Sequence, residues 1–165
     1  MLDSSLVSLD IPELRTAILF RRRPVAIPAD LRPGWRIGLL VLLLRNCCRA
    51  GRTSFARLHV LSWSFRTTES RRQLQAAVEG RILPDSLIVR FEPFLNQAVD
   101  FAIGDSLVRR VGGDKIELTA AGTKLAEELQ QIRSAFAIEK EFMKEIGQKV
   151  TETFVNKLFG GKNQL

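Results

Sequence analysis

Residues 107–122, LVRRVGGDKIELTAAG, contain the clearest structural signal of the chain. Residues that favour strands flank Gly112-Gly113-Asp114 on both sides, which predicts two antiparallel strands joined by a tight turn. Thr119 follows the second strand directly and can cap a helix with its side-chain oxygen. Gly122, in the first turn of that helix, would let the helix lie close against the rest of the protein. The stretch therefore predicts a hairpin followed directly by a helix.

Towards the N-terminus, the apolar pattern predicts three consecutive helices. Residues 36–48 are apolar nearly all round, which is typical of a buried helix. A short helix follows, for which Thr53 or Ser54 is the expected cap. The third helix covers residues 71–79 and is expected to stop at Gly80.

Two more elements are expected between the third helix and the hairpin. Residues 86–91, SLIVRF, have the β-branched and aromatic content of a strand. Pro93 then begins a helix whose apolar residues recur every three to four positions, as on one helix face.

After the hairpin, apolar residues recur at helical spacing almost to the end of the chain, with a break expected at Gly147. This apolar stripe is longer than one small domain needs for its own core, so we expect part of it to bind a partner. The partner-binding candidates in it are Phe142, Ile146, Val150, Phe154 and Leu158.

The first 33 residues are interrupted by four prolines and are expected to form an arm rather than a domain. Between the prolines lie apolar side chains that should dock either on the chain's own domain or on a partner. The predicted organisation is an arm at 1–33, a body at 34–122, a helical extension at 123–160 and a tail at 161–165. The partner-binding candidates of the arm are Leu14, Ile18, Leu19 and Phe20.

The charge pattern suggests where nucleic acid could bind. The formal net charge is +7, and because the first lysine is Lys115, the positive charge before it is all arginine. Basic side chains at the start of the third helix and on the hairpin are placed to contact phosphates, although a solvated or ion-paired surface explains them equally simply. The DNA-binding candidates are Arg66, Arg71, Arg72, Arg109, Arg110 and Lys115.

Composition argues against several other classes of protein. A single histidine, His59, and the adjacent Cys47-Cys48 pair offer neither a metal site nor a nucleophile–base pair, so we expect no enzyme, no cofactor and no small-molecule substrate. The longest apolar run, residues 37–44, is too short to span a bilayer, and the N-terminus does not resemble a signal peptide. The sequence therefore favours a cytoplasmic protein with no membrane contact.

The predicted order of elements resembles that of winged-helix domains, in which a hairpin followed by Leu-Thr-x-x-Gly and a helix is common. This gives an expected fold class of α+β, mostly α, with a winged-helix body. A succession of blocks also resembles the small middle components of bacterial ABC-three-component systems, including the winged-helix subunit of Lamassu-type antiphage defence complexes. The blocks are RPGWRIGLLVLLLRNCCRAGRTSFARLHVLSWSFRT (32–67), RRQLQAAVEG (71–80), VRFEPFLNQAVDFAIGDSLVRR (89–110) and IELTAAGTKLAEEL (116–129).

The resemblance implies a non-enzymatic adaptor that bridges an SMC-like ATPase and an effector nuclease in antiviral defence. Double-stranded DNA is a further candidate partner. The alternative is a dimeric winged-helix transcriptional regulator that binds duplex DNA, with the C-terminal helices as its dimer interface. The sequence leaves open whether DNA is touched directly, and whether the chain forms a homodimer or a hetero-complex.

Overall fold

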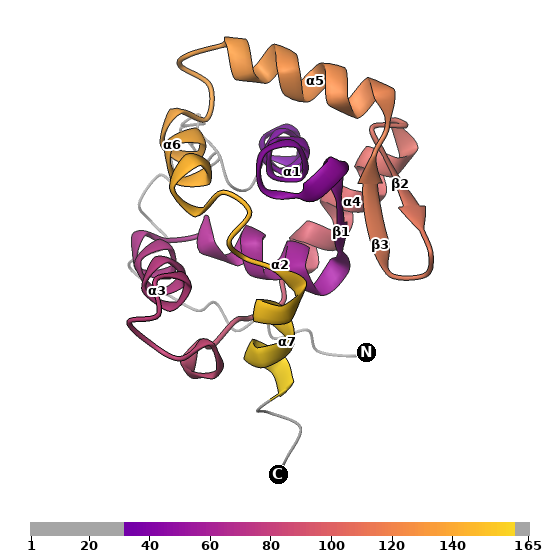
Figure 1. Ribbon diagram of the computed structural model, residues 1–165. Coiled ribbons are helices and arrows are strands. Elements are labelled where there is room, and N and C mark those ends of the chain that lie inside the picture. The colour runs from indigo at the N-terminus through magenta and orange to yellow at the C-terminus, as the bar shows by residue number, and fades with distance from the viewer. Residues whose placement is uncertain (1–31, 161–165) are drawn as a thin grey trace, which may run out of the picture.

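The computed structural model describes residues 32–160, which form seven α-helices and one three-stranded antiparallel sheet (Figure 1). The fold is therefore α+β and mostly α, as predicted. In chain order the elements are α1 (Pro33–Cys47), β1 (Arg52–Ser54), α2 (Phe55–Ser64), α3 (Thr68–Val78), α4 (Pro93–Gly104), β2 (Val108–Val111), β3 (Lys115–Leu118), α5 (Ala120–Gln131), α6 (Ala137–Ile146) and α7 (Glu152–Gly160).

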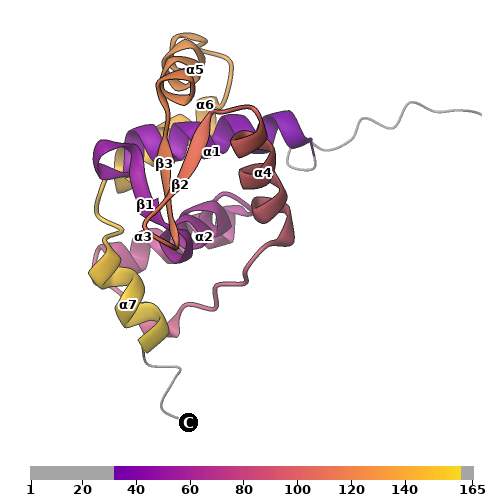
Figure 2. The same ribbon diagram turned by 90° about the vertical axis from the view of Figure 1, so that its right-hand side faces the viewer.

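Helix α1 runs through the middle of the molecule, and other helices are arranged around it (Figures 1 and 2). It contacts α2, α4, α5, α6 and strand β3. Every residue from 38 to 44 is buried. The prediction of a buried helix is confirmed, and its cause is visible: a helix that is covered on all sides needs apolar residues on all sides.

The sheet has the strand order β1-β3-β2, with β3 in the middle. The predicted hairpin is confirmed, since Val108 pairs with Leu118 and Val111 with Lys115. Strand β1 was not predicted. It has only three residues, and its pairing with β3, which joins residues more than 60 positions apart, leaves no local pattern in the sequence. Ser54, at the end of β1, is the predicted helix cap and accepts a hydrogen bond from the backbone N–H of Arg57 at 3.1 Å.

The junction between the hairpin and α5 follows the prediction closely. The Thr119 side chain accepts a hydrogen bond from the backbone N–H of Gly122 at 3.1 Å, and its hydroxyl donates to the Ser106 carbonyl at 2.6 Å. A Cβ atom placed on Gly122 would lie 2.0 Å from the carbonyl oxygen of Leu107. Only glycine permits this approach of α5 to the strand that starts the hairpin.

The strand predicted at residues 86–91 is wrong. Residues Pro84–Ser86 form a 3-10 turn, and the segment from 87 to 92 is irregular, with extended backbone at Leu87. No strand of the described chain lies beside this segment, and residues 88–91 make no backbone hydrogen bond within residues 32–160. β-propensity alone does not make a strand where no neighbouring strand is present.

The C-terminal apolar stripe is not an exposed partner surface, and this expectation needs correction. Helix α5 ends at Gln131, Gly147 provides the predicted break, and the chain turns at both places so that α6 and α7 pack against the body (Figure 1). The apolar faces of these helices belong to one core with α1 and α2, so residues 123–160 close the body rather than extend from it. Buried in this core are Phe142, Ile146, Val150 and Leu158, while Phe154 is half-buried against it.

Two buried basic side chains hold helix ends within this core. Arg57 donates from Nη2 to the Cys47 carbonyl at 2.7 Å and from Nε to the Val150 carbonyl, so it joins the end of α1 to the α6–α7 connection. Lys140 donates from Nζ to two carbonyl oxygens at the end of α5, at 2.6 and 2.8 Å. At the ends of α1 and α5, both cations thereby pair carbonyl groups of the kind that a helix end leaves without an intrahelical partner.

Candidate nucleic-acid and partner interfaces

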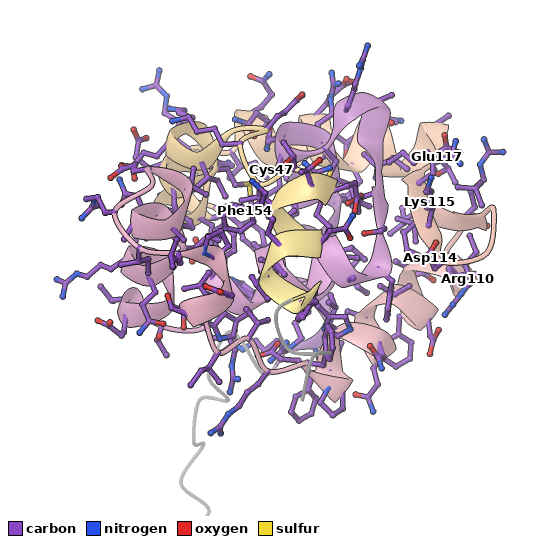
Figure 3. The ribbon with its side chains drawn as sticks, turned by 60° about the horizontal axis from the view of Figure 1, so that its bottom comes forward. Cys47, Arg110, Asp114, Lys115, Glu117 and Phe154 are labelled. Carbon is purple, nitrogen blue, oxygen red and sulfur yellow. The ribbon has the colours of Figure 1, made fainter. Side chains whose placement is uncertain are left out.

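The six DNA-binding candidates do not form one surface. Helix α3 and the hairpin lie on opposite sides of the molecule, as two views show (Figures 1 and 3). Arg71 and Arg72 belong to α3, whereas Arg109, Arg110 and Lys115 belong to the hairpin. This arrangement therefore disfavours the binding of one stretch of duplex DNA to both groups.

The hairpin arginines both have acidic neighbours. Arg109 Nη2 lies 2.7 Å from a carboxylate oxygen of Glu117, and Arg110 Nη2 lies 3.4 Å from one of Asp100. Both arginines are more than half exposed, and Lys115 is exposed and forms no ion pair within residues 32–160. Surface pairs of this kind contribute about 0–1 kcal/mol, so phosphates can compete for these arginines.

The remaining candidates lie at or near the start of α3 and have different surroundings. Arg66 forms an ion pair with the buried carboxylate of Glu92, which also receives a hydrogen bond from Arg36 Nη1 at 3.1 Å. The Nε of Arg71 is buried and has no hydrogen-bond partner in the described chain, whereas Arg72 is exposed. Arg66 is thus already paired with a carboxylate, and the Arg71 side chain is partly buried.

A surface that the sequence analysis did not predict lies between α1, α2 and α4. It is a cavity of about 340 Å³, and it shares the lining residues Arg36 and Phe94 with a smaller hollow beside Pro33. We call it the aromatic groove and define it by Trp35, Arg36, Phe65, Phe91, Phe94 and Phe101.

The aromatic groove was missed because α4 was expected to bury its large apolar residues. Leu95, Ala98, Val99 and Ala102 do face the core, but Phe94 and Phe101 are 50% and 53% exposed. These two residues are seven apart, two helical turns, and therefore share a face. That spacing is the signal from which a second apolar face of α4 is predictable.

His59 is buried and contacts Phe91 of the aromatic groove. Its ring packs edge-on against Phe55 and Phe91, and its Nδ1 accepts the backbone N–H of Glu92 at 3.4 Å. Burial lowers the pKa of His59 below its ordinary value of 6.5, although Asn96 and the Glu92 carboxylate act in the opposite direction. The folded protein therefore holds this imidazole neutral.

We expect the free energy of unfolding to fall as the pH drops from about 7 to about 5.5. Below pH 7 the unfolded chain binds a proton at His59 more readily than the folded chain does, so protons favour unfolding. Urea titrations at several pH values measure this slope. Because the chain has one histidine, His59→Gln should remove most of it. An unchanged slope in that variant would show that carboxylates cause the loss instead.

Cys47 and Cys48 are both free and buried. Burial, followed by the neighbouring Cys48, raises the pKa of Cys47 to about 12, so this thiol stays protonated at neutral pH. Residues 32–160 contain no group of three His, Cys, Asp or Glu side chains placed to hold a metal ion. None of the described helices has the length and apolarity to cross a membrane.

Comparisons with models of protein families, with curated proteins and with solved structures found no match to this chain. The arm candidates Leu14, Ile18, Leu19 and Phe20, like the tail at 161–165, lie outside the described residues.

Proposed function

We propose that this protein is a non-enzymatic adaptor of an SMC-like ATPase complex in antiphage defence. In this proposal a winged-helix body joins the cytoplasmic ATPase to an effector nuclease and assists DNA binding or sensing. The block-wise resemblance of roughly residues 33–158 to the middle components of such systems suggests the partners. The described structure contributes two further arguments, one from topology and one from surface chemistry.

The topology is compatible with a winged-helix body. Helix α1, strand β1, a set of helices and the hairpin β2–β3 follow one another, and β1 pairs with the second hairpin strand. Three helices rather than two lie between β1 and the hairpin, because α4 is added after α3. Helix α4 contacts β2, so in the proposed winged-helix body α4, rather than the third helix α3, would lie beside the hairpin as the recognition helix.

The surface of α4 is the observation that carries the proposal. Its twelve residues, PFLNQAVDFAIG, include no lysine or arginine and one acid, Asp100, while Phe94 and Phe101 are half exposed. A helix that reads DNA needs basic or amide side chains towards the bases and phosphates, and here only Asn96 and Gln97 qualify. Exposed aromatic residues instead mark surfaces that bind a polypeptide segment, of a partner or of the same chain, so α4 favours an adaptor over a DNA-reading regulator.

The connection before α4 also exposes apolar side chains. Leu83 and Ile88 are 71% and 70% exposed on a segment that contains no regular strand or α-helix. Residues 88–91 of this segment make no backbone hydrogen bond within residues 32–160, and free backbone groups beside exposed apolar side chains are suited to bind a partner chain. In the proposed complex this segment contacts the ATPase, and the hairpin arginines supply salt-dependent phosphate contacts.

Purification of the tagged full-length chain from its native host should yield a stoichiometric complex with an SMC-like ATPase and a nuclease, identified by mass spectrometry. We expect Ile88→Asp to reduce recovery of the ATPase about tenfold or more, because a carboxylate would be buried in the interface. The matched control is Ile138→Asp, which changes an equally exposed isoleucine on α6.

A monodisperse chain that captures no ATPase would contradict the adaptor. A footprint of the isolated chain at one palindromic site, with half-sites about one helical turn apart, would instead support the dimeric transcriptional regulator.

A further inference from the structure

The aromatic groove leaves an unusual amount of aromatic surface in water. Phe91, Phe94 and Phe101 are 56%, 50% and 53% exposed, and two of them line the 340 Å³ cavity. A single exposed apolar residue is ordinary, but several gathered around one hollow are typical of a surface that another segment covers.

The charges of the groove indicate what that segment should bring. Two guanidinium groups, of Arg36 and Arg66, share the single carboxylate of Glu92, which leaves the rim with an excess positive charge. The Nε of Arg36 is also buried without a hydrogen-bond partner in the described chain. An occupant with large apolar side chains and at least one carboxylate would satisfy both features.

The beginning of the described chain lies at the edge of the same groove. Pro33, the first residue of α1, lines the smaller hollow together with Phe94 and Phe101. Residues 1–31 lie outside the described residues. In the sequence, however, residues 10–20, DIPELRTAILF, contain both large apolar side chains and carboxylates, the two kinds that would complement the groove. The 12 residues between this segment and Pro33 can span up to about 40 Å, so the groove is within reach.

We propose that the aromatic groove binds the chain's own segment 10–20. Leu14, Ile18 and Phe20 would cover the exposed phenylalanines, and the Glu13 carboxylate would approach Arg36 and Arg66. A segment of the same chain is favoured over a segment of a partner. The covalent connection keeps it at an effective concentration of about millimolar, at which even a weak contact is occupied. The segment would then cover the exposed aromatic side chains of α4 and leave Leu83 and Ile88 to an external partner.

Hydrogen–deuterium exchange of the full-length chain tests this proposal. Residues 10–20 should exchange about tenfold more slowly in the natural protein than in a double variant, Phe94→Ser with Phe101→Ser, because protection requires the covered groove. The matched control, Ile132→Ser with Ile138→Ser, removes two similarly exposed apolar side chains elsewhere and should leave that exchange unchanged. Quenching of Trp35 fluorescence by acrylamide should increase in the groove variant alone.

A second variant keeps the test valid if the groove variant is unstable. Glu13→Lys alters no described residue, yet it should also accelerate exchange of residues 10–20 because lysine would face two arginines. Exchange of this segment at the rate of an unstructured peptide in the natural protein would overturn the proposal. So would protection that disappears on dilution, which would assign the groove to the arm of a second copy. Either result leaves the adaptor proposal intact, since that depends on capture of the ATPase.

Discussion

Replacing Gly122 with alanine is expected to lower the free energy of unfolding by about 3 kcal/mol or more. The added methyl group would lie 2.0 Å from the carbonyl oxygen of Leu107, a backbone atom that cannot rotate away. Helix α5 would have to move off the hairpin and lose its contacts with α1, and overpacking of this kind costs about 1–3 kcal/mol even where side chains can adjust. Urea denaturation measures the change.

The control for this substitution is Gly104→Ala. No atom lies within 4 Å of the position of the new methyl group, and Gly104 ends α4 in an exposed place. Alanine there should change the free energy of unfolding by less than about 1 kcal/mol, and the higher helix propensity of alanine favours a gain. Equal losses in the two variants would show that α5 does not depend on close contact with Leu107.

Replacing Arg57 with methionine should cost about 3 kcal/mol of the free energy of unfolding. Arg57 is only 6% exposed, and its hydrogen bonds to Cys47 and Val150 connect segments about 100 residues apart in the chain. Methionine fills a similar volume but donates no hydrogen bond, so two buried carbonyl groups lose their partner at about 1–3 kcal/mol each. The buried charge itself carries a desolvation cost, which offsets part of this loss.

The matched control is Arg45→Met, which removes an exposed ion pair with Glu127. This change should cost less than about 1 kcal/mol. An equally small effect for Arg57→Met in urea denaturation would mean that removal of the buried charge fully compensates for the lost hydrogen bonds.

Local sequence determined the parts of the fold that could be predicted. The hairpin, the Thr119 cap and the close approach of Gly122 depend on residues within 16 positions of one another, and all three are confirmed. The burial of helix α1 was predictable because its residues are apolar nearly all round, so no face of the helix is suited to water. In each case the structure is determined by residues that are close together in the sequence.

The errors have long-range causes. Residues 86–91 have the composition of a strand, but a strand needs a paired neighbour that composition does not reveal. The C-terminal residues from Phe142 to Leu158 have the pattern of an interface, and the pattern of a helix face that packs against its own core is the same. The groove was missed for a similar reason: no local feature tells which apolar face of α4 meets α1.

The central place of α1 also has a consequence for synthesis. This helix is near the start of the described chain, yet it is covered by α5 and α6, which reach residue 146. Part of its leucine-rich surface therefore stays uncovered on the ribosome until about 100 further residues have been made. Folding of the nascent chain must wait for its last third, and until then the chain presents to chaperones the apolar surface that the finished protein hides.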